Sequence, residues 1–234
     1  MEINKNNQLE LFETMLSSDI FPSKLGADKE ILEVINDTFN INMLPYYTMD
    51  MGRGLKEFNH KIYKNVDSSI RDDFWDFIFN NITYISGDID LTNTNINNLG
   101  KIRKIYGDCI INKNTKSVDL YRVNSLIIKN SNVENISVTS IADDLIITNC
   151  KKIDYFGVRN PDTECEIYGN VMVNNSKINE LAFTTVRKNV HITNSNINEL
   201  GSSAIYSEIR GNLYQRNSII YNDIATIDGR IVEK

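Results

Sequence analysis

An eleven-residue phrase that recurs along the chain constrains the fold more than any other feature of the sequence. Its pattern is φ-x-φ-x-N-[STC]-x-φ-x-x-φ, where φ is apolar, and its clearest copies lie at residues 89–99, 171–181 and 190–200. Self-similarity at a fixed period is the signature of repeat architectures. The asparagine of the phrase recurs at an average spacing near 21 residues, at Asn93, Asn114, Asn130, Asn149, Asn175, Asn194 and Asn217.

The spacing within the phrase predicts a strand followed by a turn. Apolar residues two positions apart point to one face of a strand, the N-[STC] pair ends the strand, and φ-x-x-φ supplies two inward residues from the opposite wall. One coil cannot bury its apolar face alone, but stacked coils can. We therefore expect seven coils of about 21 residues, forming a single-stranded right-handed parallel β-solenoid over residues 87–220, with strands about 4.8 Å apart.

Two structural ladders of polar side chains are expected where each strand ends. The repeated asparagines should stack in one column, and their amides should satisfy backbone groups that the turn leaves unpaired. One long step between asparagines contains Asn-Pro-Asp at 160–162, which predicts an inserted loop. The second ladder should consist of the residues that follow the asparagines, Thr94, Thr115, Ser131, Cys150, Ser176, Ser195 and Ser218.

Residues 1–84 lack the phrase and show helical periodicity. Apolar residues at helical spacing predict helices near residues 7–16, 28–39, 55–63 and 68–79. The predicted fold class is therefore α+β, with a helical N-terminal domain (1–84) followed by a β-solenoid domain with a C-terminal tail (85–234). The aromatic-rich fourth helix is expected to cap the first coil, because an open parallel edge invites aggregation.

The phrase resembles the leucine-rich repeat, L-x-x-L-x-L-x-x-[NCT]-x-L, over roughly residues 86–220. Ser, Thr or Cys occupies the family's Asn position, an Asn stands one residue earlier, and Ile and Val replace most Leu. The chain looks most like the short leucine-rich-repeat-like solenoids carried by bacteriophages. This resemblance implies a protein-binding module, and in a phage one that binds and inhibits a host defence or regulatory protein in the host cytoplasm. A right-handed β-helix is the alternative cross-section.

Composition argues against several classes of function. The formal net charge is −6, which does not favour a nucleic-acid binder. There is no run of 18 apolar residues, and the N-terminal sequence lacks the apolar region of a signal peptide, so a cytoplasmic location without membrane insertion is expected. The three cysteines, Cys109, Cys150 and Cys165, are too few for a disulfide framework and are interpreted as reduced thiols. No metal or cofactor is expected.

Few residues suggest catalysis, so the chain is not expected to be an enzyme. Gly52-Arg53-Gly54 lacks the GK[ST] ending of a phosphate loop and is interpreted as a helix-entry loop. His191 should point outward without a partner, and Asp143-Asp144 should form a solvated turn.

The competing hypothesis is a glycan-binding or glycan-cleaving β-helix, either a virion adhesin or a lyase-like enzyme. Asp88, Asp90 and Asp108 at the strand starts could bind Ca²⁺ or act on sugars, although solvated acids are favoured. The aromatic candidates for such a groove are Tyr121, Tyr155, Tyr206 and Tyr214.

The best candidate site is the outward position of the strand, the x of φ-x-φ. It is occupied in order by Asp90, Ile110, Ile127, Ile146, Met172, His191 and Tyr214, and the next outward column by Thr92, Asn112, Lys129, Thr148, Asn174, Thr193 and Arg216. Exposed neighbouring apolar side chains indicate an interface. A partner protein, a second copy in a homodimer or the helical segment could cover the column. The predicted protein-binding residues are Ile127, Lys129, Ile146, Met172, His191, Tyr214 and Arg216.

Overall fold

The computed structural model of the chain describes residues 72, 76, 79, 84–85, 88–92, 94–158 and 163–233. The chain divides into two compact units, Met1–Asp90 with Gly100–Gly107, and Leu91–Leu99 with Asp108–Lys234. The helices predicted before residue 84, apart from isolated positions in the last of them, and the Gly52-Arg53-Gly54 loop lie outside the described residues. No helix in the described part of the chain is long and apolar enough to cross a membrane.

The smaller unit contains the short strands β1 (Tyr84–Ile85), β2 (Ile89–Asp90) and β3 (Lys104–Ile105). Strands β1 and β3 pair in parallel. The buried Phe79 accepts a hydrogen bond at its carbonyl oxygen from the amide of Lys101, at 2.6 Å. A Cβ at Gly100, whose φ is 54°, would lie 2.5 Å from the same oxygen, so this position requires glycine.

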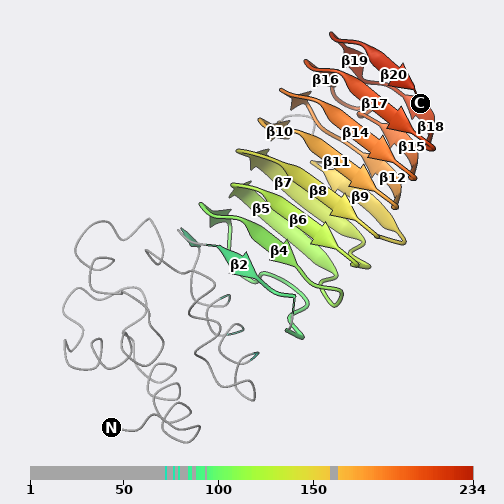
Figure 1. Ribbon diagram of the computed structural model, residues 1–234. Coiled ribbons are helices and arrows are strands. Elements are labelled where there is room, and N and C mark those ends of the chain that lie inside the picture. The colour runs from blue at the N-terminus through green and yellow to red at the C-terminus, as the bar shows by residue number, and fades with distance from the viewer. Residues whose placement is uncertain are drawn as a thin grey trace, which may run out of the picture. The chain divides into compact units, whose positions relative to one another are not determined.

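The larger unit is a parallel β-solenoid of about seven coils (Figure 1). The strands of its first side lie next to one another in chain order, and each pairs in parallel with the next. The predicted parallel stack is therefore confirmed. These strands are β4 (Cys109–Ile111), β6 (Leu126–Lys129), β8 (Leu145–Thr148), β11 (Val171–Asn174), β14 (Val190–Thr193), β17 (Leu213–Arg216) and β20 (Ile231–Glu233).

Strands also form the other two sides of each coil. The second side consists of β5 (Ser117–Val123), β7 (Asn135–Ile141), β9 (Ile153–Gly157), β12 (Lys177–Leu181), β15 (Asn196–Leu200) and β18 (Ile219–Asp223). The ends of β5 and β7 run on into the third side, which continues through β10 (Glu166–Ile167), β13 (Thr185–Val186), β16 (Glu208–Ile209) and β19 (Thr226–Ile227). Leucine-rich repeats place a helix or 3₁₀ turn in each repeat, whereas the described residues of these coils contain none.

The core fills the space between the three sides. On the first side Ile128, Ile147, Val173 and Ile192 pair in sequence and are at most 1% exposed. Opposite them, the φ-x-x-φ residues of neighbouring coils pair with each other, as Leu181 does with Leu200. The predicted inward positions are therefore confirmed, and each coil buries its apolar face against the coils beside it.

Coils of about 19 residues replace the expected 21. Asn149 and Asn175 are 26 residues apart, but the Asn-Pro-Asp turn predicted between them lies outside the described residues. The 23-residue step from Asn194 to Asn217 contains a loop that Ser207 fixes, by donating to the carbonyl of Phe183 at 2.6 Å. Beyond residue 220, β19 continues the third side and β20 the first side, where a tail was expected.

Candidate protein-binding interface

In five successive coils the first turn, between the first and second sides, is built on asparagine in the left-handed conformation. The φ angles lie between 48° and 56° at Asn130, Asn149, Asn175, Asn194 and Asn217. Asparagine tolerates this region better than other residues with a side chain, which explains why it recurs at the turn. The predicted stack is confirmed where hydrogen bonds join neighbouring asparagines, from Asn130 to Asn175 and from Asn194 to Asn217. Asn93 lies outside the described residues.

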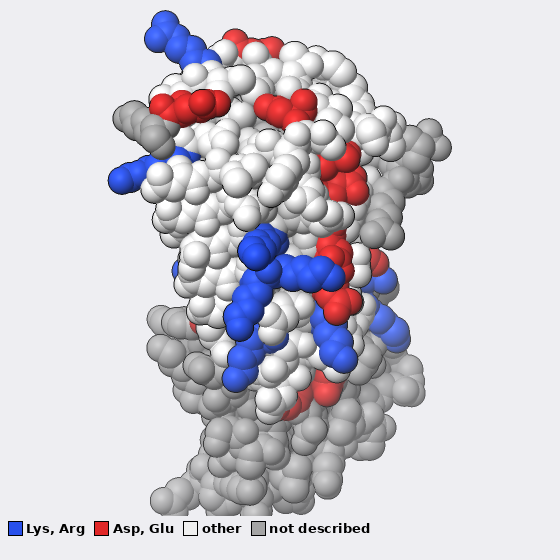
Figure 2. Space-filling model, turned by 90° about the vertical axis from the view of Figure 1, so that its right-hand side faces the viewer, with Lys and Arg blue, Asp and Glu red and all other residues white. Residues whose placement is uncertain are grey.

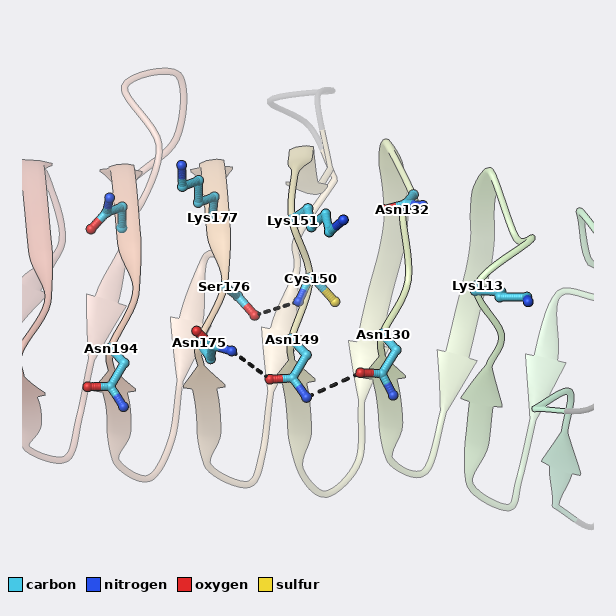
Figure 3. A pocket seen from close by; sticks show the side chains of 11 residues that line it. Lys113, Asn130, Asn132, Asn149, Cys150, Lys151, Asn175, Ser176, Lys177 and Asn194 are labelled. Carbon is cyan, nitrogen blue, oxygen red and sulfur yellow. Dashed lines mark hydrogen bonds between the residues drawn. The ribbon is translucent and has the colours of Figure 1, made fainter.

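The asparagine amides bond mainly to one another. The Nδ2 of Asn149 donates to Oδ1 of Asn130 at 3.2 Å, and that of Asn175 donates to Oδ1 of Asn149 at 2.9 Å (Figure 3). Asn217 donates to Asn194 in the same way, at 3.4 Å. The expectation that these amides satisfy backbone groups is therefore wrong for this part of the column.

The buried hydroxyl groups of the second ladder bond to the backbone groups at the first turn instead. The Oγ of Ser195 accepts the backbone N–H of Ser176 at 3.0 Å and donates to the carbonyl of Thr193 at 2.7 Å. In the same way, the Oγ of Ser176 accepts the N–H of Cys150 and the Oγ of Ser218 accepts the N–H of Ser195, and each donates to a carbonyl of its own coil. Each hydroxyl thus joins two coils and satisfies backbone groups where the chain leaves the sheet, which confirms the second predicted ladder as structural.

The second coil departs from the pattern at Asn112. Its side chain was expected to point outward, but it is 1% exposed. Its Nδ2 donates to the carbonyl oxygens of Thr94 and Ile96, and its Oδ1 accepts the N–H groups of Asn114 and Thr115. This fully bonded amide closes the turn, because the strand ends one residue earlier there. Asn114 consequently bonds to Asn95 and not to Asn130.

The second turn, between the third and first sides, carries another ladder that the phrase does not include. The Oδ1 of Asp144 accepts the N–H of Asn170 at 2.7 Å, and the Oδ1 of Asn189 accepts that of Asn212 at 2.9 Å. Asp108 bonds to the next coil in the same way. Asp108 and Asp144 are therefore half-buried structural residues and not only solvated acids, whereas Asp143 is exposed as expected. The signal that could have revealed this ladder is Gly-[Asn/Asp] at 107–108, 169–170 and 211–212.

The outward column of the first side is confirmed in register. Successive strands pair Ile127 with Ile146, Ile146 with Met172, Met172 with His191 and His191 with Tyr214. Each of these side chains is half-buried. Ile110 precedes them and Val232, which the sequence analysis missed, follows Tyr214.

The aromatic end of this column is ordered by two contacts. The rings of His191 and Tyr214 stack with centroids 4.6 Å apart and an angle of 8° between their planes. The Tyr214 hydroxyl accepts a hydrogen bond from Nδ2 of Asn212 at 3.2 Å. A cavity of about 170 Å³ beside them is lined by His191, Thr193, Tyr214, Gln215, Arg216 and Val232.

The two cations of the predicted site stand in the second outward column. Lys129 pairs with Thr148, and Arg216 pairs with Thr193. Lys129 and Arg216 are exposed and flank the apolar column at separate coils. The structure therefore places all seven predicted residues on one face of the solenoid.

Other candidate groups have structural environments. The three cysteines are buried and unbridged, and burial raises the pKa of Cys165 to about 12. No group of three or more His, Cys, Asp or Glu side chains among the described residues could hold a metal ion. Of the tyrosines proposed for a glycan site, Tyr155 is only 6% exposed and cannot line a groove.

The acids Asp88 and Asp90 belong to the smaller unit, where Asp88 is exposed and Asp90 is half-buried.

Comparison with known proteins adds no family: no family model matches the chain, and no curated protein or solved structure is significantly similar to it.

Proposed function

We propose that the solenoid is a non-catalytic protein-binding module whose partner covers the outward face of the first side. One observation carries the proposal: the column that begins at Ile110 and ends at Val232 places apolar and aromatic side chains on consecutive coils, in register and half-buried.

The chemistry of this face suits a protein interface. Interface centres are depleted of charge and enriched in aromatic residues and Met, while the rim is polar. Met172 is adaptable, and Tyr214 and Arg216 are of the types that most often dominate binding energy. Backbone pairing joins the successive strands of this face, and a preorganised surface lowers the entropic cost of association.

The repeat phrase, although not the helix-free coil, resembles leucine-rich-repeat-like phage solenoids and supports a more specific version of this proposal. The partner would then be a host defence or regulatory protein in the host cytoplasm. A second copy of this chain is the alternative occupant of the same face, and it would make the protein a homodimer.

The test is affinity capture from host extract, followed by titration with the purified partner. Ile146→Asp and Met172→Lys should lower affinity at least about tenfold, because each places an unpaired charge in a desolvated contact. Asn179→Asp on the exposed face of β12 is the matched control and should bind like the parent protein.

Light scattering on the same variants separates the two occupants. Dimerisation that Ile146→Asp abolishes would assign the column to a second copy. The proposal is wrong if the column variants bind the partner and self-associate like the parent protein.

A further inference from the structure

A second feature of the solenoid is a polar groove that runs along the first turns of consecutive coils. Its volume is about 700 Å³, and Figure 3 shows the side chains that line it. They are Lys113, Asn130, Asn132, Asn149, Cys150, Lys151, Asn175, Ser176, Lys177, Asn194 and Asn196. None of the described residues that line the groove is acidic or aromatic.

The groove is locally basic on a chain whose net charge is −6. Lys113, Lys151 and Lys177 come from three different coils and make no ion pair with a described residue, whereas the neighbouring Lys152 is paired with Asp154 at 2.9 Å. The exposed Lys129 precedes Asn130 on the coil between those of Lys113 and Lys151. Figure 2 shows Lys and Arg side chains gathered on this side of the solenoid. Four consecutive coils therefore each present a cation at or beside the groove.

The asparagine ladder also leaves hydrogen-bonding capacity on every rung. A primary amide has two donor hydrogens and two acceptor lone pairs. Asn149 uses one hydrogen toward Asn130 and one lone pair toward Asn175. Its second hydrogen and second lone pair are not used by any described residue, so the rung can both donate to and accept from a ligand. A hydroxyl group, which is itself donor and acceptor, is the matching partner.

We infer that this groove binds a linear polyuronate, an anionic polysaccharide, along the solenoid axis with about one sugar per coil. Coils repeat about every 4.8 Å, and a pyranose ring in an extended 1,4-linked chain advances by a similar length. Each uronate residue carries one carboxylate for a lysine and hydroxyls for an asparagine rung. This site lies at the first turns and does not depend on the protein-binding proposal.

An acidic peptide fits the groove less well than a polyuronate. Side chains on one face of an extended acidic peptide recur about every 6.7 Å, which does not match the spacing of the coils. Single-stranded nucleic acid is the other rival polyanion, and oligothymidylate represents it in the experiment.

The experiment measures fluorescence anisotropy of labelled hexagalacturonate with the full chain, beside hexaglutamate, oligothymidylate and neutral maltohexaose. Hexagalacturonate should bind saturably and more tightly than the other three, with an affinity that falls as salt rises. Lys151→Glu/Lys177→Glu should weaken binding about tenfold or more. Lys188→Glu, an exposed lysine at the second turn, is the matched control and should change it little.

A second variant tests hydroxyl recognition separately from charge. Asn149→Gly retains a residue suited to the left-handed turn and should weaken hexagalacturonate binding several-fold while the salt dependence is unchanged. The inference is overturned if hexagalacturonate does not bind, if hexaglutamate or oligothymidylate binds as tightly, or if Lys188→Glu has as large an effect as the double variant.

Discussion

Both turns of a coil must satisfy backbone groups left unpaired where the chain passes from one side to the next, and they do so by different means. The first turn uses a left-handed asparagine and a buried hydroxyl, as at Asn194 and Ser195. The second uses an Asn or Asp side chain that accepts an N–H group from the next coil, as Asn189 does from Asn212. Glycine often precedes the Asn or Asp of the second turn, because the backbone there passes close to the preceding coil.

The two turns consequently tolerate different substitutions. At the first turn the restriction is conformational, so asparagine can be exchanged for glycine. At the second turn the restriction is steric: a Cβ at Gly211 would lie 2.4 Å from the carbonyl oxygen of Lys188. Glycine is therefore permitted at the first turn and required at Gly211 of the second, whereas the neighbouring coil has Lys188 at the equivalent position.

Among substitutions in the two turns, the largest effect is expected for Gly211→Ala. The added methyl group must displace the backbone of the adjacent coil, and we expect a loss of about 3 kcal/mol in the free energy of unfolding, typical of overpacking. Urea denaturation measures it. Asn194→Gly on the neighbouring first turn is the control and should cost less than about 0.5 kcal/mol. Equal effects of the two substitutions would remove the distinction between the turns.

A smaller loss is expected for Ser195→Ala. It leaves the buried N–H of Ser176 without its acceptor, which should cost about 2 kcal/mol. Ser195→Cys should cost less, since Cys150 already occupies the equivalent position in another coil. If alanine and cysteine are equally tolerated in urea denaturation, the ladder does not carry the stability of the first turn.

Two substitutions of Asn175 separate the contribution of its backbone conformation to stability from that of its side-chain hydrogen bonds. Alanine is disfavoured in the left-handed region and should cost about 1–2 kcal/mol, whereas Asn175→Gly should be nearly neutral. Thermal denaturation of both variants makes the comparison. A glycine variant as unstable as the alanine variant would show that the amide ladder, and not the φ angle of 49°, selects asparagine.

Cys165, which lies outside both turns, has no expected effect at neutral pH and contributes only a pH dependence in the alkaline range. Burial raises its pKa from 9.0 to about 12 in the folded chain. A raised pKa stabilises the folded state below the unfolded value and loses that contribution as pH rises between the two values. The free energy of unfolding of the parent protein should therefore fall more steeply from pH 9 to 11 than that of Cys165→Ala. If the free energies of unfolding of the two proteins fall in parallel with pH, the pKa of Cys165 is not raised in the folded chain.

The first turn could be predicted from the sequence because its two functional residues are adjacent and recur together. The second could not be read as easily, since Asp108, Asp144 and Asn170 differ in type and bond to residues of the next coil that are distant in sequence. The outward column followed from period-two spacing alone. The burial of Asn112 was missed because a strand that ends one residue early shifts the following side chain from outside to inside.

The most direct test of the account compares one substitution at two adjacent isoleucines of β8. Ile146 belongs to the outward column and Ile147 is fully buried. In urea denaturation Ile146→Asp should cost about 1 kcal/mol, whereas Ile147→Asp should cost at least about 3 kcal/mol, because it removes core packing and buries a carboxyl group. Losses of similar size, or a larger loss at Ile146, would show that the column is covered in the folded chain and is not available to a partner.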